Sequence, residues 1–218
     1  MKKRIVCFGD SNTWGLDSVE KRRFDEDTRW TKIVEKNLNI KMNVEIIEEG
    51  LNGRTSVLND PLKEGLNGIE YIYPSILTNS PIDILVIMLG TNDSKERYSM
   101  TSYDIASGII RLANKAKDTL NSLIERDKTK AKILIIAPAR IKSSYKHVDS
   151  INSFGGNADK KTKDLPEILE KLSKENNFYF LNADEKVKVG DNDYVHLDQK
   201  GHKDMSELVT NKILELLK

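Results

Sequence analysis

The sequence predicts an α/β fold in which helices cover both faces of a doubly wound parallel β-sheet. Three observations predict it: short runs rich in Ile and Val, longer segments with helical periodicity, and their alternation along the chain. Crossovers between parallel strands are right-handed, which places helices on both faces. The length of 218 residues suits one domain, residues 1–218, with a substantial core.

Five short apolar runs have the composition of buried parallel strands. They are residues 4–8, 44–47, 82–89, 132–137 and 178–181. The chain's one cysteine, Cys7, lies in the first run, so an internal disulfide is excluded. An apolar site raises a thiol pKa, which favours buried filler over a nucleophile at Cys7.

The segments between these runs have helical spacing. Residues 30–38 form one expected helix, residues 101–124 a second, and residues 166–172 belong to a third. The last begins at about residue 199. Its apolar side chains recur at intervals of three and four, which is the spacing of one helix face: Met205, Leu208, Val209, Ile213, Leu216 and Leu217.

Charge and hydropathy exclude several classes of protein. Lys and Arg total 35 against 34 Asp and Glu, so nothing favours nucleic acid or an anionic membrane surface as a partner. No run approaches the roughly 20 apolar residues that a membrane span needs. The basic N-terminus precedes too few apolar residues for a signal peptide, so we expect a cytoplasmic protein.

Polar clusters follow the first three strands at residues 9–15, 49–55 and 90–94, and a fourth, residues 193–196, precedes the last helix. Ligands in such folds bind outside the carboxyl ends of the strands, so the four clusters should meet at one edge of the sheet. Ser11 would stand where a strand turns into a helix, and there free N–H groups favour developing negative charge. A serine hydroxyl is a weak nucleophile unless a base accepts its proton. Without such a base, the simpler explanation is that Asp10 or Ser11 caps a helix.

His196 is the best candidate for that base, because Asp193 stands three residues before it and can orient its imidazole. The position of His202 in the first turn of the last helix favours a structural role. His147 lies in a polar loop with no obvious partner. A metal site formed by His196, Asp198 and His202 is an alternative, but its spacing matches no usual zinc motif. We therefore expect no metal and no cofactor.

Acyl transfer also needs donors for the oxyanion that develops on the ester carbonyl. The candidates are the backbone N–H groups of Ser11 and Gly53 and the side-chain amide of Asn92. Asn-Gly is also a common turn pair, so Gly53 alone has a simpler explanation. We expect Asp10 and Trp14, beside the nucleophile, to contact substrate, although Trp14 could equally belong to the core.

Together the four clusters resemble the four blocks of the SGNH (GDSL) hydrolases, in the family's order. The resemblance implies a flavodoxin-like three-layer sandwich of about five parallel strands. It implies Ser11 as nucleophile, His196 as base, Asp193 as orienting acid, and Gly53 and Asn92 as oxyanion donors. The second block departs from the family pattern, which leaves the donor at Gly53 or a neighbour.

Further stretches resemble the mycobacterial arylesterase/acyltransferase branch, which implies short acyl esters as substrates, acyl transfer to alcohols and homo-oligomers. Residues 141–157 are the least recognisable part. We expect a serine esterase that acts on a small acyl ester. Alternatives are a carbohydrate O-acetyl esterase, a thioesterase or lysophospholipase with the same triad, and a non-catalytic module that binds a nucleotide or phosphate. The stretches are residues 7–11, 13–15, 29–31, 48–51, 60–61 and 88–93.

Overall fold

The computed structural model describes residues 2–218, and its centre is a five-stranded parallel sheet. The order across the sheet is β4-β1-β5-β6-β7, and every neighbouring pair is parallel. The predicted α/β, flavodoxin-like class with about five parallel strands is therefore confirmed. The strands are β1 (Lys3–Gly9), β4 (Val44–Gly50), β5 (Ile84–Met88), β6 (Lys132–Ala137) and β7 (Tyr179–Asn182).

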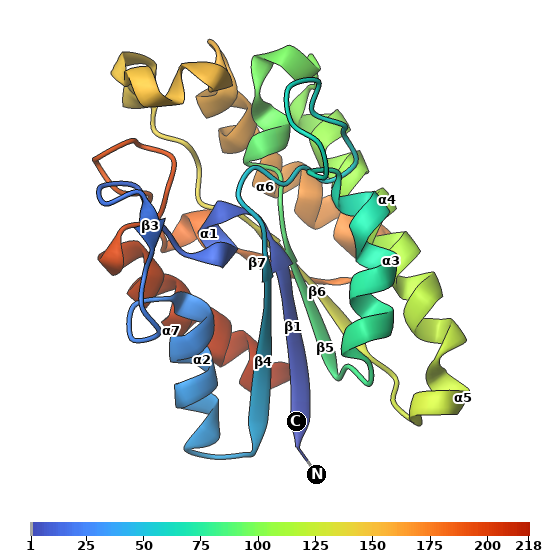
Figure 1. The fold of residues 1–218 in the computed structure, drawn as a ribbon. Helices are drawn as coiled ribbons and strands as arrows, with labels where there is room; N and C mark the ends of the chain where they lie inside the picture. The colour runs from blue at the N-terminus through green and yellow to red at the C-terminus, as the bar shows by residue number, and fades with distance from the viewer. Residues whose placement is uncertain (1) are drawn as a thin grey trace.

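Helices cover both faces of this sheet (Figure 1). The apolar side chains of α2 and α7 share one core cluster with one face of the sheet. Those of α3, α4 and α6 form a second cluster with the other face. The helices are α1 (Ser11–Trp14), α2 (Trp30–Asn39), α3 (Gly68–Asn79), α4 (Ser102–Ser122), α5 (Ile124–Asp127), α6 (Ala158–Glu175) and α7 (Gln199–Leu216).

The inner strand β1 is buried on both faces, as the unbroken apolar sequence Ile5–Phe8 requires. Its side chains alternate: Ile5 and Cys7 belong to the cluster with α2 and α7, and Val6 and Phe8 to the cluster with α3, α4 and α6. Burial raises the pKa of the Cys7 thiol, which keeps it protonated. The thiol is therefore part of the core.

The sequence analysis missed several elements. The hairpin of β2 (Leu16–Asp17) and β3 (Arg22–Arg23) has only two residues in each strand, too few for a period to show. Helix α3 was missed because Pro74 interrupts its pattern, yet Ile72 and Ile76 pack into the core. Helix α6 begins at Ala158, well before the predicted segment at residues 166–172.

The chain runs from β1 to β4 on one side and then returns to β5 on the other. Loops leaving the carboxyl ends of β1 and β5 therefore diverge, and this point is where such sheets bind ligands. No helix within residues 2–218 combines the length and apolar character needed to cross a membrane. The cytoplasmic location stays a prediction.

Candidate active site

Ser11 is the first residue of α1, directly after β1. Asp10 caps this helix by accepting the Asn12 N–H at 2.9 Å. Burial raises the pKa of Asp10 to about 6, although the bond from Asn12 opposes the rise. The helix ends after one turn at Gly15, whose φ of 87° is left-handed. This tight strand-turn-helix fixes the Ser11 backbone at the edge of the sheet.

His196 reaches Ser11 from the loop before α7. Its Nε2 lies 2.9 Å from Ser11 Oγ, and its Nδ1 lies 2.6 Å from Asp193 Oδ2. The other oxygen of Asp193 accepts the N–H groups of Val195 at 3.0 Å and His196 at 2.9 Å. The two polar clusters therefore meet across the sheet edge, as the sequence predicted.

The protonation of this trio follows from its contacts. Burial raises the pKa of Asp193, but hydrogen bonds and the nearby charge of His196 outweigh it and lower the pKa to about 2. The ionised Asp193 accepts a hydrogen bond from the imidazole, which therefore carries its proton on Nδ1. The Nε2 atom is then free to accept the proton of the Ser11 hydroxyl, which makes the serine a nucleophile.

Ser11 and His196 open into a cavity of about 350 Å³ that Gly53 and Asn92 also line. Gly53 has a φ of 87°, a conformation that glycine adopts without strain. The neighbouring Arg54 holds this loop by donating to the Gly9 carbonyl at 2.9 Å, with its guanidinium 4.0 Å from the centre of the Phe8 ring. Two of the predicted oxyanion donors thus border the same space as the nucleophile.

Comparison with known families explains this arrangement. The family model of GDSL-like lipases and acylhydrolases matches residues 7–203, which contain all four polar clusters. The chain belongs to this GDSL family. It is therefore a carboxylic ester hydrolase, and the resemblance seen in the sequence is confirmed. No curated protein sequence matches the chain significantly.

Solved structures of GDSL-type esterases cover almost the whole chain. The native aryl esterase of Mycobacterium smegmatis is 29% identical, with a TM-score of 0.90 over 98% of this chain and 99% of that one. A carbohydrate acetylesterase from Sinorhizobium meliloti is also 29% identical, with a TM-score of 0.87 over 98% and 99% of the two chains. A lipase/acylhydrolase from Enterococcus faecalis shares the fold at 16% identity and a TM-score of 0.69, over 97% and 95%.

Asn12 is a site residue of this GDSL hydrolase that the sequence analysis missed. Its Oδ1 accepts the Leu197 N–H at 2.9 Å, and its Nδ2 lies 3.5 Å from the Val195 carbonyl. These bonds join the nucleophile's helix to the residues on both sides of His196. Its place beside Ser11 was the only signal in the sequence, because the partners are 183 and 185 residues away.

Two predicted substrate contacts do not fit the structure of the hydrolase. Neither Asp10 nor Trp14 lines the cavity. Asp10 is buried and caps helix α1. Its Oδ2 lies 3.5 Å from Asn92 Nδ2, so it contacts a residue that lines the cavity without lining the cavity itself. The Arg23 guanidinium lies over the Trp14 ring, 5.4 Å from the ring centre. The short helix α1 thus directs the Trp14 side chain towards the β2–β3 hairpin.

The remaining histidines have separate surroundings. His147 is exposed. His202 is buried, with its Nδ1 3.3 Å from the Trp30 N–H. Asp198 caps α7 by accepting the Gly201 N–H, so His196, Asp198 and His202 each have a different partner. No cluster of three potential metal ligands occurs within residues 2–218.

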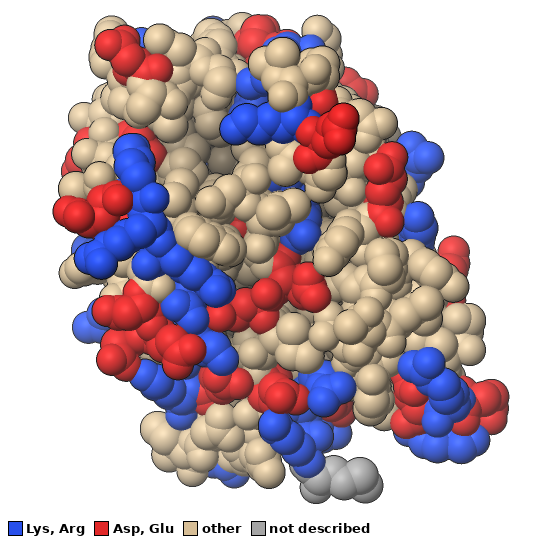
Figure 2. Space-filling view, in the orientation of Figure 1, with Lys and Arg blue, Asp and Glu red and all other residues tan. Residues whose placement is uncertain are grey.

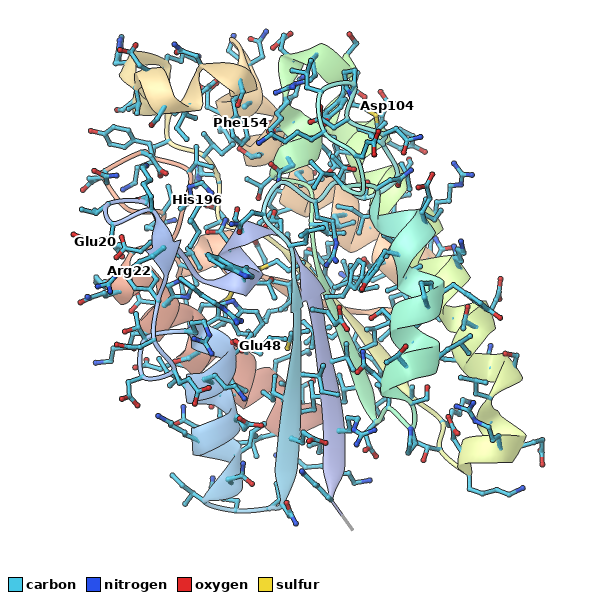
Figure 3. The ribbon with its side chains drawn as sticks, in the orientation of Figure 1. Glu20, Arg22, Glu48, Asp104, Phe154 and His196 are labelled. Atoms are coloured by element: carbon cyan, nitrogen blue, oxygen red, sulfur yellow. The ribbon has the colours of Figure 1, made fainter. Side chains whose placement is uncertain are left out.

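The wall of the cavity opposite the triad comes from other parts of the chain. Ile151 and Phe154 belong to the 3₁₀ turn Asp149–Phe154, and their side chains form a small cluster with Val195, next to His196. In Figure 3, Phe154 and His196 lie at the same end of the molecule. Lys63, Lys95 and Arg97 complete this wall. Figure 2 shows Lys and Arg atoms beside the hollow in the upper part of this face.

Proposed function

We propose that the protein is a serine esterase in which Ser11, His196 and Asp193 form the catalytic triad. One observation carries the proposal: Ser11 Oγ, the His196 imidazole and the Asp193 carboxylate form a continuous chain with contacts of 2.9 and 2.6 Å. The chain of contacts ends at a cavity large enough for a small ester.

In the proposed mechanism Ser11 attacks the ester carbonyl while His196 Nε2 accepts its proton. The N–H groups of Ser11 and Gly53 and the amide of Asn92 bind the oxyanion that forms. His196 then protonates the departing alcohol, which leaves an acyl group on Ser11. A water molecule, deprotonated by His196, releases the acid, and no cofactor takes part in any step.

Short acyl esters are the proposed substrates. A cavity of about 350 Å³ lies at the small end of the range for ligand sites, which favours acetyl-type groups over long chains. Similarity to the mycobacterial aryl esterase supports ester hydrolysis. Transfer of the acyl group to alcohols is proposed from the resemblance of the sequence to the arylesterase/acyltransferase branch. An alcohol that enters the cavity then competes with water for the acyl-enzyme.

Carbohydrate O-acetyl esters are the second candidate substrates. The acetylesterase from Sinorhizobium meliloti is as similar in sequence as the aryl esterase. Polar side chains around the cavity, such as Asn52, Lys63 and Ser153, offer partners for hydroxyl groups.

Hydrolysis of p-nitrophenyl acetate by the wild type and by Ser11→Ala tests the proposal. We expect the variant to lose nearly all activity, and a fluorophosphonate to label only Ser11, as read by peptide mass spectrometry. Ser18→Ala is the matched control, since Ser18 is a hydroxyl outside the catalytic cavity. An unchanged rate in Ser11→Ala would refute the assignment. Esters of increasing chain length, thioesters, lysophospholipids and acetylated sugars then rank the substrates.

We further propose that the protein forms a homo-oligomer. The branch it resembles supports this, and so does Leu62, which is 75% exposed although it borders the cavity. Multi-angle light scattering after size exclusion measures the oligomer directly. A monomer at micromolar concentration would contradict the proposal.

A further inference from the structure

The wall opposite the triad has more positive than negative charge. Lys63, Lys95 and Arg97 line the cavity, and Asp60 is the one carboxylate among the described residues that line it. Asp60 already accepts the Tyr98 hydroxyl at 2.7 Å and lies 3.4 Å from an Arg97 nitrogen. Asp60 thus forms an ion pair with Arg97, whereas Lys95 has Asp60 and Asp10 in its neighbourhood but forms no ion pair with either.

Lys95 is the more unusual of these two lysines. Its side chain is buried, with 7% of the residue exposed, whereas Lys63 is exposed to solvent. Within residues 2–218 its ammonium group has no hydrogen-bond acceptor and no ion-pair partner, and its Nζ lies 5.3 Å from the centre of the Phe154 ring. Burial lowers the pKa of Lys95, and Arg97 lowers it further.

A buried ammonium group without an acceptor is costly, and other partly buried lysines of this protein avoid that cost. Lys161 donates to the Ser94 carbonyl at 3.2 Å, directly beside Lys95, and Lys32 donates to the Glu35 carboxylate at 2.8 Å. The Lys95 ammonium group has no such partner among residues 2–218, so it is free to bind a group that enters the cavity.

Lys95 follows the short 3₁₀ turn Asn92–Ser94, so one segment supplies both the ammonium group and the Asn92 amide. Both side chains line the cavity of about 350 Å³ that contains Ser11. A ligand can thus place its carbonyl at Ser11 and another group at Lys95.

We propose that the ester hydrolysed by this protein carries an anionic group, a carboxylate or a phosphate, that binds Lys95 while the carbonyl lies against Ser11. The proposal rests on the esterase function proposed above and narrows its substrate class. Charge-assisted hydrogen bonds to this ammonium group give the selectivity, and the Phe154 ring holds the largely buried lysine side chain in place when the site is empty.

The test compares pairs of esters that differ in charge. In one pair, 4-acetoxybenzoate and its methyl ester, the charge is on the alcohol portion; in the other, the 4-nitrophenyl monoester of glutaric acid and its methyl ester, it is on the acyl portion. Lys95→Met removes the charge and keeps the apolar stem, and Lys95→Arg keeps the charge. We expect Lys95→Met to lower kcat/KM for an anionic ester roughly tenfold more than for its neutral partner, and Lys95→Arg to restore most of this ratio.

Lys117→Met is the matched control, because Lys117 Nζ also lies 5.3 Å from a phenylalanine ring, that of Phe178, outside the catalytic cavity. It should leave the ratio unchanged. Equal effects of Lys95→Met on charged and neutral esters in both pairs would overturn the proposal while leaving the esterase function intact. Failure of the wild type to hydrolyse any of the four esters would overturn both. A fifth substrate, 4-acetoxyphenyl phosphate, shows whether phosphate or carboxylate binds better.

Discussion

The two walls of the catalytic cavity are built differently. On the triad wall, short backbone segments hold each reactive side chain: Asp10 caps the helix of Ser11, and Asp193 accepts two N–H groups of its own loop. On the opposite wall, long side chains such as Lys95 and Arg97 extend from 3₁₀ turns and contact other side chains.

We infer from this difference that the triad wall carries out proton transfer and the opposite wall recognises the substrate. Proton transfer needs heavy-atom distances near 3 Å, and backbone hydrogen bonds fix such distances better than flexible side chains do. Recognition of a substrate tolerates more adjustment. Substitutions in the triad wall should therefore lower kcat, and those in the opposite wall should act mainly on KM and on the choice of substrate.

The largest expected effect is that of Asp193→Asn. The amide keeps the shape of the carboxylate but donates to His196 Nδ1, so Nε2 carries the proton and cannot act as a base. We expect kcat for p-nitrophenyl acetate to fall about 10,000-fold, as in other Ser-His-Asp enzymes. The matched control is Asp60→Asn on the opposite wall, which should lower kcat less than about tenfold. Similar losses in the two variants would contradict the division between the walls.

Asn92→Ala comes next. Loss of one oxyanion donor lowers kcat about 100- to 1,000-fold and leaves KM nearly unchanged, because the donor acts mainly on the transition state. Asn52 lines the same cavity but is exposed, so Asn52→Ala should change kcat by less than about threefold. Steady-state kinetics with p-nitrophenyl acetate measure both. A fall in kcat/KM that came only from KM would rule out the role of Asn92 in the oxyanion hole.

The buried His202 should make the free energy of unfolding depend on pH in acid. Burial lowers the pKa of His202 from 6.5 to about 4. The unfolded chain therefore binds the proton first, and the free energy of unfolding falls as the pH drops from 6.5 to 4, by a total approaching about 3 kcal/mol. Asp10 has the opposite effect, because its pKa in the folded protein is raised to about 6. The folded protein binds this proton before the unfolded chain does, so the contribution of Asp10 to the free energy of unfolding rises as the pH falls from about 6 towards 4.

Urea unfolding at pH 7 and pH 4 isolates the contribution of His202 when the wild type is compared with His202→Gln. The contribution of Asp10 is present in both proteins and cancels in the difference. We expect the variant to lose less stability than the wild type on acidification. His147→Gln is the control, since His147 is exposed. Equal losses in wild type and His202→Gln would show that His202 titrates normally in the folded protein.

The smallest expected effect is that of Asn12→Ala, which leaves the Leu197 N–H without its acceptor. An unsatisfied buried donor costs about 1–3 kcal/mol of stability, and the released loop should lower kcat about tenfold by misplacing His196. Asn192→Ala, in the same loop, removes only two exposed hydrogen bonds to Ser18 and should change neither quantity measurably. A loss of stability with an unchanged kcat would show that the loop keeps its position without Asn12.

Much of the architecture could be predicted because it depends on local sequence. The inner strands β1, β5 and β6 contain continuous apolar runs, whereas β4 at the edge of the sheet also carries glutamates. The residues that follow β1 and β5 include Ser11 and Asn92. The spacing of Asp193 and His196 is local as well. Their contact with Ser11 follows once parallel strands place their carboxyl ends at a single edge.

Only the tertiary structure determines which residues line the cavity beside Ser11 and His196. Trp14 and Asp10 adjoin Ser11 in the chain yet do not line the cavity, whereas Lys95 and Phe154 come from distant turns and do. Asn12 acquires its role from partners at the far end of the sequence. The physical reason is that local sequence fixes the period and ends of an element, while the direction of a side chain at a loop depends on tertiary packing.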